Sequence, residues 1–175
     1  MHNVIEVNNL ISEQEQMILR DWIVTHQDTS IFYESEYRTE RRRDTSAAIP
    51  DRFTYPQCAF DIRQRIVDNL KLEDPKLVPY PYGMVASYVN PGDVRSQYLD
   101  GTWHEDHTSY CCITSLSPAE GISHIVAGKE YALEARAGLF YTSSELAYST
   151  TELIGTEPKM FWLFGFSVPN EQTEN

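Results

Sequence analysis

The chain has 175 residues, of which 26 are acidic and 14 are basic, and its formal net charge is -12 at pH 7. This excess of negative charge argues against direct binding to nucleic acid or to anionic membranes, because both favour a basic surface. A small or weakly charged ligand fits the composition better. We expect one compact domain over residues 1–175, since a chain of this length buries a substantial core without disulfides or structural metals.

The cysteines and the apolar segments bear on the compartment. Cys58, Cys111 and Cys112 are odd in number and two of them are adjacent, so the pattern indicates reduced, buried thiols and no disulfide framework. The first residues contain no basic stretch followed by an apolar run, and no apolar segment approaches the ~20 residues needed to span a bilayer. We therefore expect a soluble, cytoplasmic protein.

The first part of the chain predicts a short strand and two helices. Residues 4–7 have the composition of an edge strand, and Ser12 with Glu15 forms a capping-box pattern that opens a helix ending near residues 25–27. The apolar positions of this helix, which we expect to pack on a sheet, are Met17, Ile18, Trp22 and Ile23. A second helix is expected over about residues 56–70, because proline is tolerated in a first turn and apolar residues again recur at helical spacing.

The second half of the chain consists of short strand-like runs separated by proline and glycine. The expected strands are residues 84–89, 110–116, 122–126, 131–134, 138–142 and 159–168. Helices first and many short strands afterwards predict an α+β domain. Its helical front covers residues 1–75, and its sandwich or barrel covers about residues 82–169.

A histidine and a carboxylate stand two residues apart in the segment Trp103-His104-Glu105-Asp106-His107. In an extended strand, residues i and i+2 point to the same face, so His104 and Asp106 would project side by side into the space that the strand encloses. One imidazole and one carboxylate, completed by a third protein ligand with positions left open, form the arrangement associated with non-haem Fe(II) oxygenases. The pair therefore predicts two ligands of a metal site, and the third ligand must come from further along the chain.

The order of the motifs resembles that of the 2-oxoglutarate/Fe(II) dioxygenases, in particular their small prolyl-4-hydroxylase-like branch. The matching segments, between about residues 84 and 168, are Tyr88 with the turn Asn90-Pro91-Gly92, His104 with Asp106, Gly138-Leu139-Phe140-Tyr141, and the strand from Lys159. The resemblance implies a double-stranded β-helix (jelly-roll) core with the two N-terminal helices packed on one sheet. It also implies Fe(II) at His104 and Asp106, and 2-oxoglutarate whose far carboxylate binds Lys159 and Tyr88. A lysine in a strand is otherwise an exposed edge residue.

The chain departs from the family's pattern at the second metal-binding histidine. The resemblance puts Tyr148 at this position, and no histidine follows His124 in the sequence. Three interpretations of Tyr148 stay open: a phenolate ligand, since a bound cation can remove the phenol proton; a wall residue beside a site with two protein ligands; or the mark of a lost metal site. Other residues that could complete the metal shell are His107, His124, Glu145 and Glu152. For His124, a satisfied core histidine is the simpler interpretation.

These motifs predict an enzyme that uses Fe(II) and 2-oxoglutarate to oxidise a small molecule or an amino acid. Because Asp106 supplies the carboxylate that halogenases of this class replace, the resemblance favours hydroxylation or desaturation over halogenation. Two alternatives stay open: a catalytically silent jelly-roll that binds a ligand or partner in the same cavity, and a metal-dependent protein that does not use 2-oxoglutarate.

No motif in the sequence indicates the substrate or the oligomeric state. The regions expected to carry specificity are residues 31–52, which we expect to form a long loop or short strands, and residues 92–102. Within the first region, one of Arg41, Arg42 and Arg43 could reach an anionic group of the substrate, because arginine forms paired hydrogen bonds to carboxylates. A solvated charge cluster explains these arginines as well.

Overall fold

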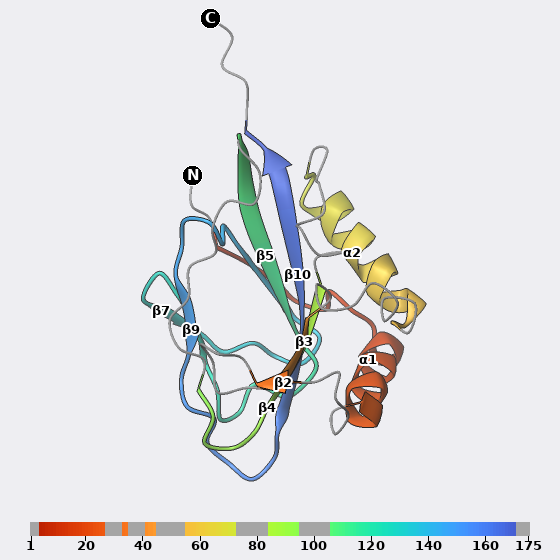
Figure 1. The fold of residues 1–175 in the computed structure, drawn as a ribbon, viewed down its shortest axis with the longest axis vertical. Helices are drawn as coiled ribbons and strands as arrows, with labels where there is room; N and C mark the ends of the chain where they lie inside the picture. The colour runs from red at the N-terminus through yellow and green to blue at the C-terminus, as the bar shows by residue number, and fades with distance from the viewer. Residues whose placement is uncertain are drawn as a thin grey trace, which may run out of the picture.

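The structure is a computed structural model that describes residues 4–26, 33–34, 41–44, 55–72, 84–94 and 106–170. For residues 33–34 and 41–44 only the course of the backbone is described. Helices α1 (Glu13–His26) and α2 (Gln57–Asn69) lie against one face of a large antiparallel sheet, and a small sheet lies across from the other face (Figure 1). The predicted α+β class is confirmed.

The described strands form two sheets. The large sheet has the order β1-β8-β5-β10-β4-β3-β2, and the small sheet has the order β7-β6-β9. The strands of the large sheet are β1 (Ile5–Val7), β2 (Tyr33–Glu34), β3 (Arg41–Asp44), β4 (Met84–Val89), β5 (His107–Ser115), β8 (Gly138–Tyr141) and β10 (Lys159–Pro169). Those of the small sheet are β6 (His124–Val126), β7 (Lys129–Tyr131) and β9 (Tyr148–Thr150). All neighbours pair antiparallel.

The start of α1 is a capping box that is also tied to α2. The backbone N–H of Ser12 donates to Glu15 Oε1 at 2.9 Å, and the N–H of Glu15 donates to Ser12 Oγ at 3.1 Å. Arg65 of α2 donates from Nη1 and Nη2 to the two carboxylate oxygens of Glu15 at 2.8 and 3.0 Å. The predicted capping box is confirmed, and its glutamate also joins the two helices.

The buried stripe of α1 differs from the predicted one. Leu19, Trp22 and Ile23 are buried, at positions i, i+3 and i+4. The prediction was wrong for Met17 and Ile18, which are 59% and 39% exposed. The large sheet covers only one narrow face of the helix, with Leu19 near its middle, and the neighbouring apolar positions point toward solvent.

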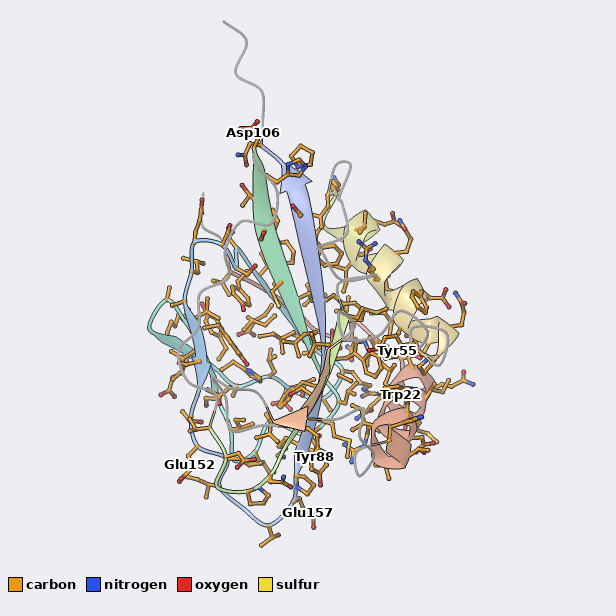
Figure 2. The ribbon with its side chains drawn as sticks, in the orientation of Figure 1. Trp22, Tyr55, Tyr88, Asp106, Glu152 and Glu157 are labelled. Atoms are coloured by element: carbon orange, nitrogen blue, oxygen red, sulfur yellow. The ribbon has the colours of Figure 1, made fainter. Side chains whose placement is uncertain are left out.

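Alternation along the strands gives the large sheet two apolar faces. The face toward the helices carries Met84, Ala86, Met160, Trp162, Phe164 and Phe166. The face toward the small sheet carries Val85, Val89, Cys111, Ile113, Phe161 and Leu163. Trp162 is fully buried on the helix side, with its ring 5.5 Å from the rings of Trp22 and Tyr55, which Figure 2 shows beside the helices. A residue of β4 or β10 therefore reaches the space between the sheets only if it shares the face of Phe161.

The complete jelly-roll stays a prediction. A jelly roll has eight strands in two sheets, and residues 95–105, which connect β4 to β5, lie outside the described part of the chain. His104 and most of the predicted specificity regions lie outside it as well. Within the described residues, no helix has the length and apolar character that crossing a membrane requires.

Candidate functional site

Lys159 is a buried cation at the first position of β10. Its side chain is on the strand face of Phe161, which looks into the space between the sheets, and the residue is only 8% exposed. Its Nζ donates a hydrogen bond to the carbonyl oxygen of Pro118 at 2.8 Å. Within the described residues, this neutral oxygen is the hydrogen-bond partner of the ammonium group. An ammonium group carries three N–H donors, so two more acceptors could bind it. The position fits the carboxylate of a bound anion, because burying an uncompensated charge is costly.

Tyr88 does not face Lys159. It lies opposite Met160 in the ladder of β4 and β10, and it packs against the cluster on the helix side. Val89, which lies opposite Lys159, belongs to the cluster between the sheets. Because successive residues of a strand point to opposite faces, the structure places Tyr88 and Lys159 on opposite sides of the large sheet. It therefore does not bring together the two residues predicted to share one carboxylate.

Asp106 lies in a turn at the head of β5. Its φ of 62° is left-handed rather than extended, and the residue is exposed. The argument that His104 and Asp106 share one face of a strand therefore fails at Asp106. His104 itself lies outside the described residues, so the pair stays a prediction.

Asp106 and Lys159 also lie at opposite ends of the central strand. The residue after Asp106 pairs with Pro169 at the end of β10, whereas Lys159 begins that strand. β10 has 11 residues, and the ten steps from the first to the last, at about 3.3 Å each, span roughly 33 Å. Figure 2 shows Asp106 at one end of β5 and β10, and Tyr88 and Glu157 toward the other end.

Tyr148 and His124 form a buried pair between the sheets. Each is 1% exposed, and the hydroxyl oxygen of Tyr148 lies 2.7 Å from Nδ1 of His124. The ring of Tyr148 stacks on those of His124 and Tyr141 at 5.9 and 5.8 Å between centroids. The edge of the His124 ring meets Phe161 at 4.9 Å. The structure thus brings together two residues that the sequence singled out separately, and it does so through β9, a strand that the sequence did not predict.

The other residues considered as metal ligands are spread over the molecule. Glu145 and Glu152 are exposed, and His107 is half-buried at the first position of β5. Figure 2 shows Glu152 near the small sheet, away from Asp106. The described part of the chain has no group of three His, Cys, Asp or Glu side chains that could hold a metal ion. The described residues therefore supply one buried cation, Lys159, that an anion could pair with, and do not by themselves form a metal site.

Solved structures share the architecture of this chain. A Pseudomonas putida prolyl-4-hydroxylase is 13% identical with a TM-score of 0.65, and the match covers 98% of this chain and 95% of that one. A 2OG-Fe(II) oxygenase family oxidoreductase from Burkholderia pseudomallei is 10% identical with a TM-score of 0.68, covering 98% and 88%. HygX from Streptomyces hygroscopicus, solved with nickel and 2-oxoglutarate bound, is 14% identical with a TM-score of 0.61, covering 99% and 85%. No family model and no curated protein matches the sequence.

Proposed function

We propose that this chain, whose fold is that of the 2-oxoglutarate/Fe(II) oxygenases, binds 2-oxoglutarate through Lys159 and is an oxygenase for a small molecule or an amino acid. The observation that carries the proposal is the buried ammonium group of Lys159, which has only a neutral carbonyl oxygen as its partner among the described residues. A carboxylate of 2-oxoglutarate would supply the missing negative charge and accept the remaining N–H groups.

The metal half of the proposal rests on His104 and Asp106. An imidazole and a carboxylate would hold Fe(II), which supplies the oxidising chemistry when it is bound. The described residues contribute only Asp106 to this pair, in an exposed turn. The H-x-D motif and the shared fold support hydroxylation or desaturation of the substrate as the proposed reaction.

A titration of the purified chain, stripped of metal with EDTA, tests both halves. Mn(II) is added first in one series and 2-oxoglutarate first in the other, and binding is followed by calorimetry. We expect 2-oxoglutarate to bind, and His104→Ala to weaken Mn(II) binding. If neither Mn(II) nor 2-oxoglutarate binds in either order, the proposed function is wrong.

A second candidate is a catalytically silent protein that binds a ligand in the same interior without a metal. Two observations favour it: Tyr148, which the resemblance aligns with the second histidine, is hydrogen-bonded to His124, and Asp106 lies in an exposed turn. Under this alternative, 2-oxoglutarate or another dicarboxylate binds to the wild type and to His104→Ala with the same affinity, and Mn(II) does not bind. Succinate formation in step with substrate oxidation would exclude it.

A further inference from the structure

The hydroxyl of Tyr148 has a hydrogen-bond partner within the protein, so it is satisfied without a bound metal ion. Tyr148 opens β9 and lies opposite Val126 of β6, while His124 lies at the other end of β6, opposite Thr150. The two side chains reach across the small sheet and meet at 2.7 Å. Because both are 1% exposed, neither polar group has bulk water as an alternative partner.

Aromatic and apolar side chains surround the pair in the described part of the chain. Tyr141 and Phe161 contact its rings, and Val126 packs in the same cluster. The described residues contain no group of three His, Cys, Asp or Glu side chains that could hold a metal ion. Within the described residues, a metal ion at the phenol oxygen would therefore compete with a formed hydrogen bond whenever the hydroxyl donates it to His124.

We infer that His124 and Tyr148 form a metal-independent hydrogen-bonded pair that joins β6 to β9 and takes the place of a metal ligand in the interior. His124 is thus a positioning residue for Tyr148, and Tyr148 is a wall residue rather than the third metal ligand. The inference goes beyond the proposed function, since the pair forms whether or not Fe(II) binds at His104 and Asp106.

A double-mutant cycle in EDTA tests the pair. Tyr148→Phe removes only the hydroxyl, and His124→Phe removes the ring nitrogens while keeping a ring against Phe161. We expect each single variant to lower the folding equilibrium constant, the ratio of folded to unfolded protein, by roughly fivefold or more. We expect the double variant to lose much less than the product of the two single losses, because they remove the same bond. Tyr131→Phe, a half-buried tyrosine of β7 in the same sheet, is the matched control and should change the constant by less than about twofold.

Two further measurements separate this inference from the proposed function. Wild type and Tyr148→Phe should bind Mn(II) equally, and the ferric protein should lack a phenolate-to-iron charge-transfer band. If the variants do not fold, long-range ¹H–¹⁵N spectra of the wild type still report on His124, whose ring signals should be unchanged when EDTA is replaced by Zn(II). Multiplicative losses in the cycle, a tenfold loss of Mn(II) binding in Tyr148→Phe, or a His124 shift with Zn(II) would overturn the inference. A protein that binds neither Mn(II) nor 2-oxoglutarate but shows the coupling would refute only the proposed function.

Discussion

Replacing Lys159 with methionine distinguishes the effect of its buried charge on the stability of the free protein from its effect on ligand binding. Methionine has a similar length and no charge, so it fills the same interior beside Val89 and Phe161. The change removes one hydrogen bond to the Pro118 carbonyl, which contributes about 1 kcal/mol. It also removes a buried ammonium group whose charge has no described counterion, and exchanging buried charges for apolar groups stabilises proteins by about 1 to 4 kcal/mol. The free variant should therefore be more stable than the wild type by up to about 3 kcal/mol, which is about 2 to 4 °C in Tm for each kcal/mol.

The ligand should stabilise the wild type more than the variant if Lys159 binds a carboxylate. At a 2-oxoglutarate concentration of about 100 Kd, the wild type gains about 2.7 kcal/mol of stability. Truncating one partner of a buried charged hydrogen bond costs about 2 kcal/mol or more in binding, which is roughly a 30-fold weaker affinity. The same ligand concentration is then about 3 Kd for Lys159→Met, and the stabilisation falls to about 0.8 kcal/mol.

Thermal unfolding with and without 2-oxoglutarate measures both effects. The control variant is Lys129→Met, which removes the same charge from an exposed position on β7, and it should respond to 2-oxoglutarate as the wild type does. 2-Oxobutyrate, which lacks the far carboxylate, is the control ligand and should stabilise wild type and Lys159→Met equally. Equal stabilisation of these two proteins by 2-oxoglutarate would refute the assignment of Lys159 as the carboxylate-binding residue.

Three further predictions concern the rest of the fold. The hydrogen bond from Arg65 holds the pKa of Glu15 below its usual 4.5, so Glu15→Gln should lower the free energy of unfolding by about 1 kcal/mol above pH 4.5. Urea titrations should show this difference from wild type shrinking as the pH falls below 4.5 through the lowered pKa, where the wild-type carboxylate becomes protonated. Gly121, at φ +90°, leaves no room for a Cβ beside the backbone carbonyl oxygen of Ile154, so Gly121→Ala should cost over about 3 kcal/mol. Gly128→Ala, at φ +81° in open space, should cost about 1 to 2 kcal/mol in the same denaturant assay. Burial raises the pKa of the Cys58 thiol to about 11, so its alkylation followed by mass spectrometry should be slow at pH 8 and rise about tenfold per pH unit; fast alkylation of the folded chain at pH 8 would contradict this.

The sequence predicts elements well where one local signal defines them. The capping box at Ser12 starts α1 as predicted, and Pro56 precedes α2 as its N-cap. β4 has the predicted bounds, 84–89, because a turn follows it and its residues are strand formers. β9 was missed because three residues, Tyr148–Thr150, are too few to show an alternating pattern, and the strand exists through its pairing with β6.

The geometry of the site depended on facts that spacing does not carry. The side of the sheet that Tyr88 occupies follows from its place opposite Met160, and strand register is set by long-range pairing. The turn at Asp106 requires a left-handed backbone, which aspartate tolerates but does not announce. The sequence named both Tyr148 and His124 as residues of interest, but their contact links two strands that lie 24 positions apart in the chain. The sequence thus indicated which residues to consider, but not which side of a sheet each of them occupies.

The charges of the buried residues bear on how the two halves of the proposed function relate. Within the described part of the chain, Lys159 is the one buried residue with a formal charge, and no buried Asp or Glu accompanies it. Such an interior attracts an anion and repels a divalent cation, because charges interact strongly where water is excluded. The proposed function therefore assigns metal binding to the segment with His104 and Asp106, and dicarboxylate binding to Lys159 at the other end of β10. It follows that 2-oxoglutarate should stabilise the chain in EDTA, without the metal chelation on which its binding would otherwise depend.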